Sequence, residues 1–435
     1  MRKSVSFKVD DLFEFKAKLL QWSQQFNEVV WLDSNKHTGK YSSFDAVLAA
    51  DALTAIATDS YNAFEDLKVY QAETKDWIFG YLSYDLKNNI ECLKSENFDG
   101  LHFPDLYFFQ PKKIIQIIDR EVHFLYLRMV DNEIELDYKE ICGLDLKMDK
   151  GQGARTPIPI KMRIFKDEYF YRLGKMLERI HRGDIYEANF CQEFYAEGVE
   201  VNPLQTYLEL NSISEPPFAV FLKLSDKYLM SASPERYIKK EGIKVISQPI
   251  KGTAKRSLDV EEDEKLRLSL EQDEKERAEN IMIVDLVRND LSKSAEKSSV
   301  VVEELCKAYT FKQVHQMIST VTSIVSTNKN PVDIVRETFP MGSMTGAPKI
   351  SAMRIIEELE ATKRGLYSGA VGYFTPDNNF DFNVVIRSIL YNVTEKYVSF
   401  SVGGAITARS IPEREYEECL LKAKAMRQVL EGKVS

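Results

Sequence analysis

Short runs rich in aromatic and β-branched residues recur along most of the chain, and they constrain the fold more than any other feature. Bounded by turn residues, such runs predict β-strands. They lie at residues 29–35, 77–86, 106–119, 122–130, 218–224, 228–233, 243–248, 366–374, 382–392 and 397–407. Apolar residues at helical spacing predict helices at about 169–180, 261–291, 332–338, 347–361 and 412–431. Strands separated unevenly by helices, several as hairpin neighbours, predict an α+β protein with a largely antiparallel sheet.

One break in composition divides the chain. The segment MDKGQGARTPIPI, residues 148–160, is polar and contains two glycines and two prolines. Such a segment is typical of a linker. Because 435 residues exceed what one hydrophobic core usually serves, we predict two regions, residues 1–150, mostly sheet, and residues 151–435.

Composition excludes several classes of function. The formal net charge of −9 argues against nucleic-acid binding, because neutralising phosphates needs a basic surface. The five cysteines never form a C-x-x-C pair, so neither a disulfide framework nor a zinc site is expected. No window approaches the ~18 consecutive apolar residues of a membrane span. We therefore expect a cytoplasmic protein that acts on small molecules, with no membrane and no nucleic-acid partner.

Two pairs of glutamates share the spacing E-x-x-E on separate predicted helices: Glu276 with Glu279, and Glu415 with Glu418. This spacing puts both carboxylates of a pair on one helical face. If the two helices meet, their oxygens form a ligand set that suits Mg²⁺ held partly through water and substrate oxygens. The alternative is two solvated charged helices, although Glu279 directly precedes the apolar run IMIVDLV and so needs a partner.

Three further features could carry chemistry. Residues 338–353, TFPMGSMTGAPKISAM, predict a glycine-rich loop that opens a helix and offers free N–H groups to an anion, or an ordinary capped helix start. His315 lies in a strand-like run and is either a hydrogen-bonded core residue or a catalyst. Arg387, flanked by apolar residues, needs a buried anion: a substrate carboxylate or an internal salt bridge.

Glu235 in SASPER and Lys251 in PIKGT lie on consecutive strand-like segments. If these segments pair as a hairpin, a general acid and an amine nucleophile face one pocket. Taken alone, without that pairing, Lys251 is better interpreted as an ordinary loop lysine.

Eight ordered stretches resemble the chorismate-utilising enzymes, a family that includes anthranilate, aminodeoxychorismate, isochorismate and salicylate synthases. They are GDIYEANFCQEF, SASPER, PIKGT, AENIMIVDLVRNDL, GSMTGAPK, YSGAVGYF, VVIRS and PEREYEECLLKAK. The resemblance is dense from about residue 164 to 430 and faint before 150, where WLDSN and IFGYLSYDL are similar to component I of the first two members. It implies a large, largely antiparallel β-sandwich with flanking helices, with residues 151–435 as the chorismate-binding catalytic domain.

The resemblance also implies a role for each matching residue. Glu279 and Glu418, supported by Glu276 and Glu415, would hold Mg²⁺ against the ring carboxylate of chorismate. Glu235 would protonate the departing 4-hydroxyl, and His315 would lie beside the reacting ring. The remaining substrate contacts implied are Tyr367 and Arg387, at the pyruvyl carboxylate, and Thr253, Ser343, Gly403 and Lys422 around the pocket.

Lys251 distinguishes branches of the family. Anthranilate and isochorismate synthases resemble PIAGT or PLAGT at this point, whereas aminodeoxychorismate synthases have a lysine, and the Ser343 and Thr345 of GSMTGAPK agree with the latter. The lysine would attack C2 of chorismate as the 4-hydroxyl leaves, and ammonia would then add at C4 and expel it. This requires partly deprotonated Lys251, which burial and a nearby metal ion are expected to favour.

Two residues depart from the family pattern. Glu187 stands where the water-using members have a lysine and the ammonia-using members usually have glutamine. Ala405 replaces the second glycine of a G-x-G strand, and its methyl group would crowd the carboxylate contacts near Gly403.

Ammonia must have a source, and the sequence contains no cysteine-centred glutaminase motif. We therefore expect a separate glutamine amidotransferase subunit as partner, with free ammonia usable in its absence. The rival interpretations are component I of anthranilate synthase and a non-catalytic homologue that binds chorismate or tryptophan. An LLES-like tryptophan-binding sequence near the N-terminus would favour the first, and DSN at 33–35 matches it only in part. The latter would be expected to lose Glu235, Arg387 or a metal-binding glutamate, and all are present.

Overall fold

A computed structural model describes residues 2–37, 39–146 and 157–432. The strands are β1 (Arg2–Lys8), β2 (Glu28–Asp33), β3 (Ala46–Thr58), β4 (Ile78–Leu82), β5 (Leu106–Ile118), β6 (Glu121–Leu127), β7 (Lys161–Met162), β8 (Glu187–Glu197), β9 (Phe218–Leu224), β10 (Lys227–Ser233), β11 (Arg236–Glu241), β12 (Lys244–Gln248), β13 (Ile250–Lys255), β14 (Val301–Thr310), β15 (Val314–Ile324), β16 (Gly346–Ala347), β17 (Ala370–Phe374), β18 (Phe380–Val384), β19 (Ser388–Asn392) and β20 (Tyr397–Thr407).

The helices are α1 (Leu12–Ser23), α2 (Ala63–Thr74), α3 (Lys87–Ile90), α4 (Ile134–Gly143), α5 (Lys166–His181), α6 (Pro203–Ser214), α7 (Val260–Gln272), α8 (Glu274–Ser292), α9 (Pro331–Thr338), α10 (Lys349–Leu359) and α11 (Pro412–Glu431). Three short 3₁₀ turns, η1 (Tyr84–Leu86), η2 (Arg128–Glu133) and η3 (Gly342–Met344), complete the described elements.

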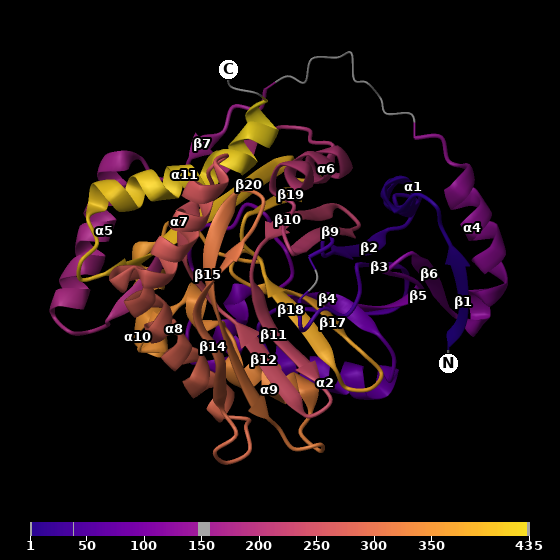
Figure 1. The fold of residues 1–435 in the computed structure, drawn as a ribbon, viewed down its shortest axis with the longest axis horizontal. Helices are drawn as coiled ribbons and strands as arrows, with labels where there is room; N and C mark the ends of the chain where they lie inside the picture. Colours follow the sequence, from indigo (N-terminus) through magenta and orange to yellow (C-terminus); the bar gives the residue numbers. More distant parts are fainter. Residues whose placement is uncertain (1, 38, 147–156, 433–435) are drawn as a thin grey trace.

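The strands form one large sheet in which every pairing between two named strands is antiparallel. Two arms diverge at β5. The first runs through β3, β2, β9, β10, β19 and β20 to β8, and β6 and β1 extend it at its other end. The second runs through β4, β17, β18, β11 and β12 to β15, which also pairs with β13 and β14. In Figure 1 the first arm extends from β20 and β19 through β9 and β2 to β3 and β5 at the right of the view, and β11, β12 and β15 of the second arm lie nearer the centre.

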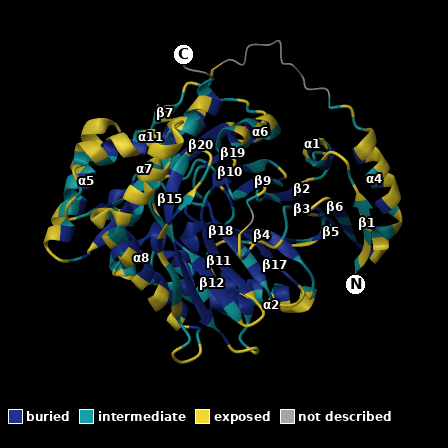
Figure 2. Ribbon diagram, in the orientation of Figure 1, coloured by how far each residue is buried: buried dark blue, intermediate teal, exposed yellow. Residues whose placement is uncertain are grey.

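The main hydrophobic core lies between the two arms. Leu222 and Leu229 of the first arm belong to the same buried cluster as Tyr237, Val371 and Phe382 of the second. Burying these side chains removes apolar surface from water at about 25 cal/mol per Å², which holds the arms face to face. The predicted α+β fold, a largely antiparallel sandwich with flanking helices, is therefore confirmed, and Figure 2 shows the buried strands inside the exposed helical faces.

Helices pack against both arms. On the first arm, α11 packs its Cys419, Ala423 and Met426 into a second core cluster with strand residues such as Phe221 and Met230. On the second arm, α8 packs across β13 and β15, and α7 lies along β14. The two helices that bear the E-x-x-E pairs thus cover different arms.

Two predicted elements are wrong in detail. The helix predicted at 261–291 is two helices, α7 and α8, because the chain turns at Asp273, whose side chain accepts a hydrogen bond from the N–H of Glu276 and caps α8. The strand predicted at 382–392 is interrupted between β18 and β19 at Arg387, whose φ of 52° is left-handed and does not fit an extended strand.

The predicted division at residues 150 and 151 falls outside the described residues, and the two regions on either side share the sheet through β2 with β9 and β4 with β17. The division stays a prediction. Over the residues that the structure describes, no helix is long and apolar enough to cross a membrane.

Candidate active site

The hairpin of β11 and β12 brings Glu235 beside the strand of Lys251. Arg236 pairs with Gln248 in this hairpin, so the residues just outside it, Glu235 and Ile250, meet. The N–H of Ile250 donates to the Glu235 carboxylate, which also accepts a hydrogen bond from Ser343 and feels the positive charge of Lys251. The predicted meeting of Glu235 and Lys251 is therefore what the structure contains.

Glu235 is almost fully buried, with 5% of its surface exposed. Burial raises the pKa of its carboxyl to about 7, although Ser343, Lys251 and the N–H of Ile250 oppose that shift. A carboxyl group of this pKa is protonated in a large share of molecules near neutral pH. Glu235 therefore has the property that a general acid needs.

Lys251 lies in a ring of carboxylates. Its Nζ is 3.1 Å from Oε1 of Glu187, and its side chain is 12% exposed. Burial lowers the pKa of this amine, but the negative charges of Glu187, Glu279 and Glu235 outweigh that effect, so the pKa is raised above its usual value. Burial acts on Lys251 in the expected direction, but without a metal ion the carboxylates outweigh it, because Glu187 lies beside the amine. The expected effect of a nearby metal ion stays a prediction.

The two E-x-x-E pairs come together from opposite arms of the sheet. Glu276 and Glu279 of α8 face β13, where a Cβ on Gly252 would lie 3.1 Å from Oε2 of Glu276. Glu415 and Glu418 of α11 face β20, where a Cβ on Gly404 would lie 3.5 Å from Oε2 of Glu415.

Charges link the two pairs. Burial raises the pKa of Glu276 and brings that of Glu279 to about 7. The Glu418 charge adds to the rise at Glu276. Glu418 itself has a lowered pKa, because Lys422, with Nζ 2.7 Å from its Oε1, outweighs burial. The alternative considered above, two unrelated solvated helices, does not describe this arrangement.

The oxygens of these four glutamates fit a magnesium ion that other ligands help to hold. Within the described ranges, no three His, Cys, Asp or Glu side chains lie close enough to form a complete metal site. Mg²⁺ often needs only one or two protein carboxylates and completes its octahedron with water and substrate oxygens. Carboxylates that burial and mutual repulsion push toward protonation, such as Glu279 with Glu276, would be relieved by a divalent cation. Magnesium binding remains an inference from this chemistry.

Arg387 is positioned to bind an anion. Its left-handed backbone turns it out of the strand direction, and among the described residues no side-chain carboxylate forms an ion pair with its guanidinium. Burial lowers its pKa, while nearby Tyr367 and Glu418 oppose the shift. Tyr367 is buried, with its hydroxyl 3.6 Å from Sγ of Cys191. The internal salt bridge considered for Arg387 is absent from the described part of the chain, and its contact with a substrate carboxylate stays a prediction.

His315 lies in an internal hydrogen-bond network. Its Nδ1 is 3.0 Å from Oγ1 of Thr310, and its Nε2 is 3.0 Å from Oδ1 of Asp263 on α7. With both ring nitrogens engaged and 1% of its surface exposed, His315 has the contacts of a hydrogen-bonded core residue. Its role beside a reacting ring stays a prediction.

The remaining predicted contacts are spread over four elements, η3, β13, α11 and β20. Ser343 is buried in η3, and Thr253 is an exposed residue of β13. Lys422 donates to the carbonyl of Gly403 over 2.9 Å. Gly403 packs against β8, since a Cβ there would lie 2.5 Å from Sγ of Cys191, whereas the neighbouring Gly404 faces the Glu415 and Glu418 carboxylates. Sequence reasoning missed Gly404 and Gly252, although each is a glycine beside a residue that it selected.

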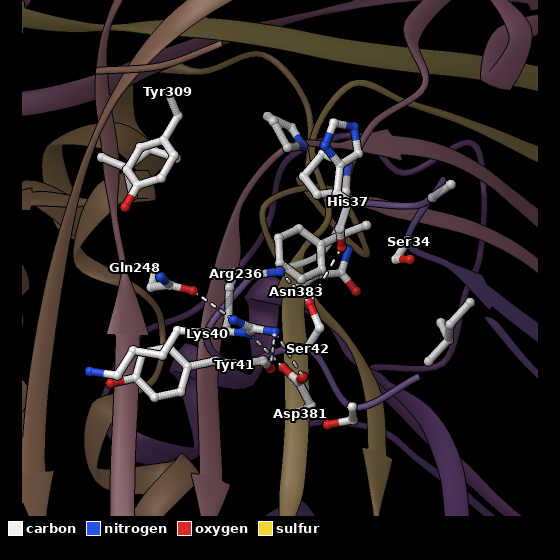
Figure 3. A pocket seen from close by; sticks show the side chains of 18 of the residues that line it. Ser34, His37, Lys40, Tyr41, Ser42, Arg236, Gln248, Tyr309, Asp381 and Asn383 are labelled. Carbon is white, nitrogen blue, oxygen red and sulfur yellow. Dashed lines mark hydrogen bonds and ion pairs between the residues drawn. The ribbon is translucent and has the colours of Figure 1, made fainter. Parts of the chain in front are cut away.

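A cavity of about 740 Å³ lies next to these strands. It is bordered by residues of the segments 32–37 and 39–44 and by the strands that carry Arg236, Gln248 and Asp381. Figure 3 shows Arg236 in its wall, hydrogen-bonded to Gln248 and Asp381. Pro234, Arg236 and Ile250 line this cavity, whereas their sequence neighbours Glu235 and Lys251 do not. This is the pattern expected where successive side chains point to opposite faces. The cavity therefore shares a wall with the candidate active site without containing it.

Comparisons with known proteins agree with this geometry. The family model described as chorismate binding enzyme matches residues 27–428. The chain therefore belongs to the chorismate binding enzyme family. It is 35% identical to the protein named "Probable aminodeoxychorismate synthase, chloroplastic" of Oryza sativa subsp. japonica, over 81% of this chain and 43% of that protein. It is 33% identical to "Anthranilate synthase component 1" of Thermus thermophilus, over 81% of this chain and 77% of that protein.

The match thus spans about two-fifths of the rice relative's length. Among solved structures, anthranilate synthase component I from Streptococcus pneumoniae superposes with a TM-score of 0.77 at 25% identity, covering 90% of this chain and 95% of that one. The chain is a chorismate-utilising enzyme by family, and the comparisons leave the choice between these two activities to the chemistry of the site.

Proposed function

We propose that the protein converts chorismate and ammonia to 4-amino-4-deoxychorismate, the precursor of 4-aminobenzoate in folate biosynthesis. The observation that carries the proposal is the enclosed amine of Lys251, held beside Glu187 and the acidic Glu235. Direct addition of ammonia to chorismate needs no amine at this place. A double displacement needs one nucleophilic amine and one general acid within reach of the same ring.

The chain's own residues divide the reaction between them. Neutral Lys251 attacks C2, both ring double bonds shift by one position, and the 4-hydroxyl leaves C4 as water with the proton of Glu235. Ammonia then attacks C4, both double bonds shift back, and Lys251 leaves C2 as a neutral amine. Arg387 binds a substrate carboxylate and fixes the ring relative to Lys251. Mg²⁺, held by Glu279 and Glu418 with Glu276 and Glu415 in support, would neutralise the other carboxylate.

The product identifies the reaction. The purified chain is incubated with chorismate, Mg²⁺ and ammonium at mildly alkaline pH, and the products are analysed by mass spectrometry. We expect 4-amino-4-deoxychorismate, which retains the pyruvyl group. Anthranilate with free pyruvate would instead assign the chain to the activity named for its Thermus relative, and Mg²⁺-dependent chorismate binding without consumption would indicate a non-catalytic homologue.

We also propose that a separate glutamine amidotransferase subunit supplies the ammonia. Co-purification of the two subunits, and glutamine-dependent turnover that needs both, are the expected results. The contrary result is turnover with ammonium, but no association with any amidotransferase encoded by the same genome and no glutamine-dependent rate with it. That result would contradict this partner.

The two reacting groups predict a characteristic pH dependence. Only molecules with protonated Glu235 and neutral Lys251 form the adduct. The pKa of Glu235 is about 7 and that of Lys251 is raised. Between these two pKa values, a rise in pH increases the neutral fraction of Lys251 and decreases the protonated fraction of Glu235 by the same factor. We expect the single-turnover rate of adduct formation, without ammonium, to rise with pH up to about 7 and then to level off.

Glu235→Gln tests the assignment of this profile. Without the titrating acid, the remaining slow rate should continue to rise above pH 7, since it then follows only the neutral fraction of Lys251. A variant that levels off at the same pH as the wild-type protein would show that another group causes the plateau.

A further inference from the structure

A second, smaller cavity lies beside Glu235. Its volume is about 20 Å³, and Glu235 and Ser343 line it together with Val287 and Asp290 of α8. Ser343 donates a hydrogen bond to the Glu235 carboxylate. About 10–15 Å³ is enough for one water molecule, provided that two to four polar groups surround it. The cavity therefore has room for one water molecule beside the proposed general acid.

Asp290 is the other acidic residue that lines this cavity. It is 4% exposed, and each of its carboxylate oxygens accepts a hydrogen bond from a lysine, Oδ1 from Lys293 over 3.1 Å and Oδ2 from Lys349. Because a carboxylate oxygen has two acceptor positions, Asp290 can accept a further hydrogen bond from a water molecule. Tyr237 and Thr338, whose hydroxyl oxygens are 2.6 Å apart, also line the cavity. Polar groups for a bound water are thus present on several sides.

The two lysines that bind Asp290 differ in their access to solvent. The side chain of Lys349 is 12% exposed, and its Nζ also donates to the carbonyl of Pro340 over 2.9 Å. The side chain of Lys293 is 45% exposed. Lys293, Asp290 and the cavity therefore form a series of groups that leads from solvent to Glu235.

Each turnover of the proposed reaction removes a proton from Glu235. The carboxyl gives this proton to the departing 4-hydroxyl, which leaves as water. Ammonia then adds at C4, and the product keeps all three protons of its new ammonium group near neutral pH, because a primary amine has a pKa above 7. One proton must therefore reach Glu235 from solvent before the next turnover, although Glu235 is only 5% exposed.

We propose that Asp290 and a water molecule in this cavity return the proton to Glu235 after each turnover. This inference rests on the proposed function. The water gives a proton to the Glu235 carboxylate and takes one from Asp290, which takes one from the ammonium group of Lys293. A solvent proton then restores Lys293, so that the net change is one proton moved from solvent to Glu235. Asp290 is thus a positioning residue that acts on the substrate through Glu235.

The test compares three rates in the wild-type protein and in Asp290→Asn, which keeps the shape of the side chain but cannot relay a proton. The first is adduct formation with chorismate alone, the second is product release when ammonium chloride is added to the adduct, and the third is steady-state turnover. Only the third requires Glu235 to regain its proton. We expect it to fall about tenfold or more, as for the loss of a group that transfers protons, with the first two within about twofold.

A second variant leaves every polar group in place and does not depend on Asp290→Asn folding. Val287→Ile adds one methyl group to a side chain that lines the cavity, and this methyl group takes the room of the water. Val284→Ile is the matched control, because Val284 is a buried valine of the same helix that does not line the cavity. Val287→Ile should slow steady-state turnover alone, as Asp290→Asn does, and Val284→Ile should leave all three rates unchanged.

The outcomes separate this inference from the proposed function. Steady-state rates within about twofold of wild type in both variants would show that Glu235 regains its proton from the product or on its substrate side, and would overturn the inference alone. Equal falls in all three rates would assign a structural role to Asp290, and a fall in Asp290→Asn without one in Val287→Ile would assign the effect to its charge; each overturns the water route. A wild-type protein that forms neither adduct nor aminated product overturns the proposed function and this inference with it.

Discussion

The variant Lys251→Ala loses at least roughly 100-fold of its ammonium-dependent production of 4-amino-4-deoxychorismate, as expected when one member of a cooperating catalytic pair is removed. The physical reason is that, among the described residues, Lys251 is the cation whose charge the Glu235 carboxyl feels. Without it, only direct addition of ammonia remains. The rate of product formation is measured by mass spectrometry at saturating chorismate and ammonium.

The covalent adduct can be measured directly, and its formation would not depend on Lys251 if the role of this residue were only structural. Wild-type protein mixed with chorismate in the absence of ammonium should gain the mass of chorismate less one water, and Lys251→Ala should not. Lys255→Ala is the matched control, because Lys255 is an exposed lysine on the same strand. An ammonium-dependent rate within a few-fold of wild type in Lys251→Ala would contradict the double displacement.

Loss of stability must be separated from loss of chemistry. Removing Lys251 leaves Glu187 as a buried carboxylate without its ion pair, which costs about 3–5 kcal/mol when a buried pair is broken. The double variant Lys251→Met with Glu187→Gln removes both charges and should unfold at a temperature closer to that of the wild-type protein. It should remain as inactive as the single variant, and thermal unfolding followed by circular dichroism checks the comparison.

The sequence predicted the fold class because strand-like runs carry their own local signal. Where the local signal and the tertiary environment disagree, prediction failed. The strand β3, AVLAADALTAIAT, is rich in alanine, which has low β-propensity, and it is a strand only because it pairs with both β2 and β5. In the same way, Arg387 stands in an apolar strand-like run, but its left-handed backbone ends the strand.

The sequence indicated which residues of the candidate site lie near one another, but it did not indicate their pKa values. The spacing of Glu276 with Glu279 fixes their common helical face, and the hairpin signal brought Glu235 to Lys251. The charge state of Lys251 depends instead on Glu187, which is 64 positions away along the chain. No periodicity in the sequence encodes such a contact, because it arises from the order of strands in the sheet.

The proposed Mg²⁺ site gives the second large effect that we expect. Replacing Glu418 with glutamine should weaken Mg²⁺ binding in the presence of chorismate by roughly 100-fold. Mutating residues that only support metal ligands already costs about 10–100-fold in metal affinity, and a carboxylate that would contact the ion should contribute at least as much. Glu417→Gln is the matched control, an exposed glutamate one position earlier on α11. Isothermal titration calorimetry measures both affinities, and equal affinities would contradict a role for Glu418 in holding the ion.

The state of Glu279 adds a test of how the metal is held. Its pKa is raised to about 7, by burial above all, with Glu276 adding to the rise and Lys251 opposing it. At pH 7 a large share of the molecules therefore carries a proton that a cation must displace. Mg²⁺ binding should release protons at pH 7 and release almost none at pH 8.5, where Glu279 is already ionised. The heat of binding in buffers of different ionisation enthalpy measures this release, and a value that does not change with pH would mean that Glu279 keeps its proton and that the ion is held by α11 and the substrate alone.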